Sequence, residues 1–313
     1  MSAAGRKIGY EEVVPRDLHF KMNTDTVARH WFNGDPWVTH WMNGILAAVP
    51  DGERWVMNSA RIQLDNLKDP EVRQAAVNFC RQERIHAREH DEMNAACVAQ
   101  GVPIDKVEAI FTKLRVQMQD RLSHDMQSSI AAAFEHFSAV ISSVMLENPE
   151  LFDETDPELR AMLYWHFVEE TEHKGVSFDV FVAASGGGIK GYAKRVGGMV
   201  LATAIGFPIM IGNHGYLLYK DRQLTNWRSA LRMSNVLFGN PGILTRIIKS
   251  HYVPYFMPDF HPWDDDNREV IHVWKRAYDK TNDTHKAFQA LRAWQRKRSN
   301  APANRPQLTL QSA

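Results

Sequence analysis

Cysteine is scarce in this 313-residue chain, which contains only Cys80 and Cys97. They form neither a CxxC pair nor a cluster with histidine, which excludes a zinc finger and argues against a disulfide framework. Such cysteine usage fits a reducing compartment. The N-terminal stretch MSAAGRKIGYEEVV has no apolar signal core. We therefore expect a cytoplasmic protein, with membrane association left open by a segment described below.

An excess of charge of either sign is also missing, because 37 basic residues balance 37 acidic ones. No overall field attracts a polyanion, so we expect no nucleic-acid partner. Hydrophobic residues make up 44% of the chain, enough for a sizeable core, which excludes global disorder.

The sequence lacks clear β-alternating runs and hairpin dipeptides, so we predict an all-α fold. Turn signals divide it into an N-terminal arm (1–24), a helical bundle (25–188), an apolar segment with a helical C-terminal region that packs on the bundle (189–299), and a disordered tail (300–313). Within the bundle, one helix is expected to run from 158 to about 185.

A single long run lacks Asp, Glu, Lys and Arg: residues 196–219. Its length approaches the roughly 20 residues of a membrane span. Four residues interrupt it: Pro208, Gly212, Asn213 and His214. The uninterrupted apolar part, 199–211, has 13 residues, which argues against a complete transmembrane helix.

Two alternatives remain for residues 196–219. The first is a hairpin, either buried in the fold or forming the interface of a homodimer. The second is a peripheral contact with a membrane. The basic amphipathic stretch 286–298 is either a solvated surface helix or a second contact with anionic lipid.

What the chain does contain is a repeated four-residue motif. Glu83-x-x-His86 and Glu170-x-x-His173 each place a carboxylate and an imidazole three positions apart. Residues at this spacing share one face of a helix and can bind the same ion. A single such motif arises easily by chance on a charged helix, whereas two with matching surroundings are much harder to obtain.

A lone glutamate lies upstream of each motif: Glu53 is 30 residues before Glu83, and Glu135 is 35 residues before Glu170. In an antiparallel bundle these spacings bring four carboxylates and two imidazoles around one point, the ligand set of a dinuclear iron or manganese centre. Glu135 lies in an apolar stretch, where an unpaired carboxylate would be costly. Glu53 could instead be a helix-start carboxylate favoured by the helix dipole.

Two further histidines share these helix faces. His166 extends the second motif to H-x3-E-x2-H, and we predict it as a ligand. His90 lies four residues after His86 and stays open between a ligand and a residue that supports one. Glu169 and Glu172 flank the second motif and are expected to point to other faces. The predicted metal ligands are Glu53, Glu83, His86, His90, Glu135, His166, Glu170 and His173.

The segments FCRQERIHAREHDEMN and WHFVEETEHKGVSFDVF resemble bacterial proteins named "predicted metal-dependent hydrolase", a resemblance that covers residues 18–300. The ligand pattern is similar to that of ferritin-like di-iron carboxylate oxygenases. Its H-x3-E-x2-H element looks like the p-aminobenzoate N-oxygenases, in which an additional histidine joins the iron ligands. These resemblances imply a ferritin-like bundle core and two iron ions, with manganese or a mixed Mn/Fe pair as the alternative.

Two enzyme functions follow as hypotheses. The first is a non-haem di-iron oxidoreductase that activates dioxygen to oxidise a small, lipophilic organic substrate, with electrons from an external donor. The alternative is a metal-dependent hydrolase whose two ions activate a water. Iron storage fits poorly, because a storage ferritin would call for a shorter chain with cage interfaces.

Overall fold

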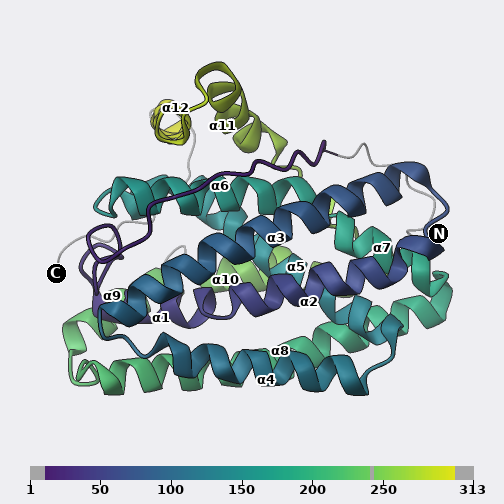
Figure 1. Cartoon of the computed structure of the whole chain (residues 1–313), viewed down its shortest axis with the longest axis horizontal. Coiled ribbons are helices and arrows are strands. Elements are labelled where there is room, and N and C mark those ends of the chain that lie inside the picture. The colour runs from purple at the N-terminus through teal and green to yellow at the C-terminus, as the bar shows by residue number, and fades with distance from the viewer. Residues whose placement is uncertain (1–10, 240–242, 300–313) are drawn as a thin grey trace.

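The computed structural model describes residues 11–239 and 243–299, and all regular structure within these ranges is helical (Figure 1). The all-α prediction is therefore confirmed. The predicted tail, 300–313, lies outside the described residues, as do the first ten residues of the predicted arm.

Four helices surround the centre of the bundle: α2 (Val49–Gln63), α3 (Pro70–Ala99), α5 (His124–Glu147) and α6 (Pro157–His173). The remaining α-helices are α1 (Pro36–Leu46), α4 (Ile104–Arg121), α7 (Val176–Ser185), α8 (Gly188–Lys220), α9 (Trp227–Phe238), α10 (Ile243–Ile247), α11 (Arg268–Thr281) and α12 (Thr284–Ser299).

Local sequence sets where the central helices begin. Asp69 caps α3 by accepting a hydrogen bond from the Glu71 amide, and Asp156 caps α6 in the same way. A proline follows each cap, where its missing N–H is not needed and its φ angle already suits a helix. The first residues of α3 and α6 are thereby fixed, and with them the positions of the motifs farther along.

The helices pack lengthwise into a bundle in which α2 lies against α3 and α5, and α5 also contacts α6, α7 and α8. Figure 1 shows α11 and α12 at one edge of the molecule, next to α6, and α4 and α8 at the opposite edge. The chain before α1 runs in extended form across the bundle, past α6 and α3. Large buried side chains such as Trp165, Tyr164 and Phe152 fill the interior.

The predicted helix 158–185 is in fact two helices, because α6 ends at His173 and α7 begins at Val176. A Cβ atom on Gly175 would lie 2.9 Å from the indole nitrogen of Trp263, so only glycine allows this close approach at the junction. The second motif therefore lies in the last turn of α6.

The hairpin alternative for residues 196–219 is wrong, since α8 is one continuous helix of 33 residues with Pro208 inside it. Pro208 is exposed on the side of α8 that faces away from the bundle. Asn213 and His214 do not interrupt the helix either, because they are buried on the side that packs against α1. His214 Nε2 donates a hydrogen bond to the Trp37 carbonyl at 3.1 Å.

Two described helices are long and apolar enough to cross a membrane by length and composition alone, α5 and α8. In α5, 78% of the most apolar window is buried inside the molecule, as in a core helix. In α8 the buried share is only 22%. The two helices therefore differ in how much apolar surface they leave uncovered.

Candidate metal centre

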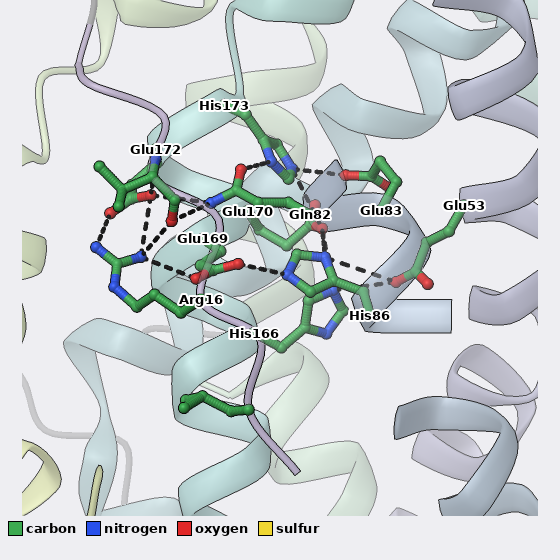
Figure 2. A network of polar contacts seen from close by, with 12 residues as sticks. Arg16, Glu53, Gln82, Glu83, His86, His166, Glu169, Glu170, Glu172 and His173 are labelled. Carbon is green, nitrogen blue, oxygen red and sulfur yellow. Dashed lines mark hydrogen bonds and ion pairs between the residues drawn. The ribbon is translucent and has the colours of Figure 1, made fainter. Parts of the chain in front are cut away.

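Seven of the eight predicted ligand residues come together in two groups of donor atoms, each group with its atoms within 4.8 Å of one another. The first group consists of Glu53, His86, His166 and Glu170, and the second of Glu83, Glu135 and His173. The side chains come from α2, α3, α5 and α6, and all seven are buried. Figure 2 shows them from close by, except for Glu135.

Glu170 connects the atoms of the first group. Its Oε1 lies 3.0 Å from His166 Nε2 and 3.5 Å from His86 Nδ1. Glu53 Oε1 faces the same two rings, at 3.3 Å from His166 Nε2 and 4.0 Å from His86 Nδ1. Two carboxylates and two imidazoles thus surround one point.

His173 stands at the middle of the second group. Its Nε2 lies 3.2 Å from Glu83 Oε1 and 3.3 Å from Glu135 Oε2. The same nitrogen lies 3.3 Å from Glu170 Oε1. Because this one oxygen of Glu170 reaches ring nitrogens of both groups, the two groups are neighbours that share a carboxylate.

Many of these atoms lack a hydrogen-bond partner although they are buried. Both carboxylate oxygens of Glu53 and of Glu83 make no hydrogen bond, and neither do His86 Nδ1, Glu135 Oε2 or His173 Nε2. Buried polar atoms are normally paired, and buried carboxylates need a cation or a proton. These buried oxygen and nitrogen atoms converge at one place without hydrogen-bond partners. They therefore fit the donor set of bound metal ions.

The electrostatics of the two groups suit a site for cations. Burial raises the pKa of Glu53 to about 8, and burial together with the neighbouring carboxylates raises the pKa of Glu83 well above its usual range. Burial alone would lower the pKa of His173, but Glu170 and Glu135 raise it to about 10. Divalent cations at this place would favour ionised carboxylates and neutral imidazoles instead.

Two of the imidazoles are held from behind by hydrogen bonds (Figure 2). His86 Nε2 donates to Glu169 Oε2 at 3.0 Å, which leaves Nδ1 facing the first donor group. His173 Nδ1 donates to Gln82 Oε1 at 3.0 Å, which leaves Nε2 facing the second. Such partners fix the ring orientation and raise the basicity of a metal-binding histidine.

Arg16, in the extended N-terminal chain, ties these two supports together. Its Nη1 donates to Glu169 Oε1 at 2.8 Å, and its Nη2 donates to Glu172 Oε1 at 2.8 Å. Glu172 in turn accepts a hydrogen bond from Gln82 Nε2 at 3.1 Å. The buried Arg16 guanidinium therefore supports both histidines. It reaches His86 through Glu169, and it reaches His173 through Glu172 and Gln82.

Sequence reasoning missed this support. Glu169 and Glu172 lie outside both donor groups, as expected, but they hold His86 and His173 in place, Glu169 directly and Glu172 through Gln82. The sequence could have indicated Gln82, because it lies four residues before His86 and therefore on the same face of the helix. Arg16 has none, because it is 153 residues from Glu169 and nothing in the sequence places the arm against α6.

His90 belongs to neither donor group. Its Nε2 forms a hydrogen bond of 2.8 Å with His166 Nδ1, so it lies behind His166 on the side away from the carboxylates. Burial and the neighbouring imidazoles lower the pKa of His90 well below its usual value, which keeps the ring neutral. His90 thus lies outside both donor groups and next to His166, the position expected of the supporting residue among its two alternatives.

A cavity of about 400 Å³ lies close to the end of α6. His136 and Lys174, each next in sequence to a member of the second donor group, line it together with His251 and Asn267. None of the seven donor residues lines this cavity. His136 is buried and bonds the His251 carbonyl at 3.2 Å, away from both donor groups.

The model of one protein family, described as "Predicted metal-dependent hydrolase", matches residues 14–266. The chain belongs to this family. The match spans all seven donor residues and Arg16, so metal dependence and the clustered donors point to the same part of the chain. No curated protein and no solved structure matches the chain.

The family confirms one of the two resemblances noted from the sequence, that to the predicted metal-dependent hydrolases. It implies a metal cofactor, without saying which ion. Its description agrees with the hydrolase alternative more directly than with oxygenase chemistry, which has no support from the comparisons.

Proposed function

We propose that the seven donor residues hold two metal ions, one in each group, with Glu170 shared between them. The observation that carries this proposal is the position of Glu170 Oε1, 3.0 Å from His166 Nε2 in one group and 3.3 Å from His173 Nε2 in the other. Four carboxylates and three imidazoles supply enough donors for two ions and leave coordination positions open for a small molecule.

The chemistry of the donors favours iron or manganese. Carboxylates and imidazoles suit these ions, and neither Cys80 nor Cys97 belongs to a donor group, so no thiolate favours zinc. Inward-facing glutamates and Glu-x-x-His motifs on four helices are the arrangement of ferritin-like di-iron and di-manganese carboxylate proteins. We therefore assign the pair as two iron ions, with manganese or a mixed Mn/Fe pair as the alternative.

The reaction we propose first is oxidation of a lipophilic organic substrate by dioxygen, with electrons from an external donor. Two reduced iron ions would supply two of the four electrons that dioxygen takes up, the substrate would supply the other two, and the external donor would reduce the iron again. The contribution of the chain is to orient the ligands and exclude water. Trp165 packs edge-on against His86, with ring centroids 4.8 Å apart, and Phe79 packs against His173 at 4.9 Å, so apolar rings border both donor groups.

Hydrolysis is the second candidate, and the family description favours it. Two divalent ions can lower the pKa of a bound water and polarise a carbonyl or phosphoryl oxygen. In this case the open positions would take water and an ester, amide or phosphate group in place of dioxygen.

Reaction with dioxygen separates the two candidates. Protein reconstituted with ferrous iron under anaerobic conditions is expected to hold about two irons per chain and to change its absorption spectrum on exposure to dioxygen. A fully loaded protein with no spectral change would rule out the oxygenase proposal.

Hydrolysis of simple esters by the manganese or zinc form, lost in Glu135→Gln, would favour the second candidate. The matched control is His136→Asn, which changes the next residue on α5, also buried but outside both donor groups. This variant is expected to keep its metal and its activity.

A further inference from the structure

One stretch of the chain carries an excess of positive charge although the whole chain is neutral. Residues 188–258 contain nine Lys and Arg residues and a single acidic residue, Asp221. With 37 residues of each sign in the chain, the rest must carry a matching acidic excess. We call residues 188–258 the basic layer.

Five of the nine basic side chains are exposed. They are Lys190, Lys220, Arg222, Arg228 and Lys249. Three others pair with acidic side chains of neighbouring helices: Lys194 with Asp125, Arg232 with Asp35, and Arg246 with Glu147. The five exposed basic side chains of this layer therefore face solvent, whereas the three paired ones hold the layer to neighbouring helices.

The basic layer also contains most of the exposed apolar side chains. Among the described residues, 17 large hydrophobic side chains are exposed, and 12 of them lie in this layer. On α8, Val200, Phe207 and Ile211 follow one another at spacings of seven and four, so they share the face that points away from the bundle. Each of the three is about half exposed.

Aromatic and basic side chains occur together where α8 ends. Tyr219 is 64% exposed and lies against the Lys220 ammonium, and Trp227, 67% exposed, lies against the Arg228 guanidinium. Aromatic rings next to Lys or Arg are typical of the headgroup level of a membrane, where the ring is half buried and the cation meets phosphate.

The chain that follows α10 returns along α8. Tyr252 Oη bonds Thr203 Oγ1 at 3.2 Å, and Tyr192 Oη donates to the Phe256 carbonyl at 2.8 Å, so the returning chain runs beside the first half of α8. α8 forms an edge of the molecule opposite α11 and α12 (Figure 1). Because α8 packs lengthwise on α5 and α1, it lies along the bundle and does not leave it to span a membrane.

We propose that the basic layer docks on the surface of an anionic phospholipid membrane, with Val200, Phe207, Ile211 and Trp227 entering the headgroup region. A second copy of the chain would bring two surfaces of the same positive sign together, which disfavours a dimer through this layer. The other basic stretch, on α12, differs because its apolar residues Ala287, Phe288 and Leu291 are buried in the core. The proposal does not depend on which reaction the metal centre performs.

Vesicle co-sedimentation tests the docking. The full chain is expected to bind vesicles of phosphatidylcholine mixed with phosphatidylglycerol, to bind phosphatidylcholine alone far more weakly, and to lose binding as salt is raised. The triple variant Lys220→Glu, Arg222→Glu, Arg228→Glu should reduce the partition coefficient by about tenfold or more. Trp227→Ala should reduce it as well, with unchanged circular dichroism and Tm.

The matched control is the triple variant Arg296→Glu, Lys297→Glu, Arg298→Glu at the end of α12, which makes the same charge change outside the basic layer. It should bind vesicles nearly as well as the parent chain. Loss of binding in this control alone would overturn the proposal, and so would equal binding to neutral vesicles. A dimer in lipid-free solution that Phe207→Glu dissociates, without any vesicle binding, would assign the layer to a second copy instead.

Discussion

A single carboxylate oxygen, Glu170 Oε1, lies within 3.5 Å of ring nitrogens from three histidines. Although burial alone would raise the pKa of Glu170, the adjacent His173 and a hydrogen bond from His166 hold it well below its usual range. A carboxylate that stays ionised between two donor groups is suited to bridge two cations.

Removing one imidazole should therefore affect metal content directly. His173→Ala is expected to lower the metal content from about two ions per chain to one or none, because the second group would keep only carboxylates. Elemental analysis by mass spectrometry measures this. His136→Ala, which removes a buried histidine outside both groups, should keep both ions. Full occupancy in His173→Ala would contradict the ligand assignment.

Arg16 is expected to act on metal affinity without touching the ions. Arg16→Ala leaves Glu169 and Glu172 without their shared guanidinium, so the supports of His86 and His173 loosen, and metal affinity should fall by about 10- to 100-fold. Competition with a chelator measures the affinity.

Arg88→Ala is the control for Arg16, since Arg88 also fastens the N-terminal chain to α3, through Asp17 and the Leu18 carbonyl, but does not contact Glu169 or Glu172. An equal loss of affinity in both variants would show that anchoring the arm, and not supporting the histidines, is what matters.

The residues of the site differ in how far the sequence could predict them. Glu83, His86, Glu170 and His173 were predictable because helical spacing alone puts each pair on one face. Their hydrogen-bond partners were not, since a partner such as Arg16 is brought in by tertiary packing, which leaves no trace in local periodicity.

At the scale of elements, α8 and α5 approach so closely that one glycine is needed. A Cβ atom on Gly198 would lie 2.1 Å from Ser129 Oγ and 2.9 Å from the Ser129 carbonyl carbon. Gly198→Ala should therefore lower the free energy of unfolding by roughly 1–3 kcal/mol. Gly206→Ala, on the same helix with open space around it, should raise it by about 0.5–1 kcal/mol. Chemical denaturation compares the two, and equal effects would show that the helices can separate at no cost.

Acid should weaken the contact between α8 and α1. Burial lowers the pKa of His214 from 6.5 to about 4, although its hydrogen bond to the Trp37 carbonyl opposes the shift. Between these values the unfolded chain binds a proton that the folded chain does not, so the stabilisation is fully present above pH 6.5 and is lost as the pH falls towards 4.

His214→Gln keeps a donor for the Trp37 carbonyl but cannot titrate. The free energy of unfolding of the parent chain should fall relative to that of this variant by up to about 3 kcal/mol between pH 7 and pH 4. Parallel denaturation curves at a series of pH values measure the difference. Identical pH dependence in the two proteins would show that His214 titrates normally in the fold.

The sequence predicted the helical class of the fold, but not every element. It placed breaks correctly where Pro and Asp form an N-cap, as before α3 and α6. It missed the break at Gly175, where the constraint is the distant indole of Trp263. It also expected Pro208 to interrupt α8, but the helix continues through this residue, which lies on its exposed side, despite the lost hydrogen bond and the ring clash of an interior proline.

At the scale of the whole molecule, two features lie apart. The donor groups are enclosed by the central helices, and α8, the longest helix of the basic layer, lies at the edge opposite α11 and α12. The family match, from residue 14 to residue 266, includes the residues of both donor groups and of the basic layer. We predict that the layer positions the bundle at a lipid surface, a place where a lipophilic substrate of the metal centre would be concentrated.

The most direct test of the dinuclear centre is an anomalous-scattering map from crystals grown with iron, collected on both sides of the iron absorption edge. We predict two peaks, roughly 3.5–4 Å apart, as in other two-metal sites. One peak should lie among Glu53, His86 and His166, the other among Glu83, Glu135 and His173, with Glu170 between them. A single peak, or a peak that lies away from these side chains, would contradict the account.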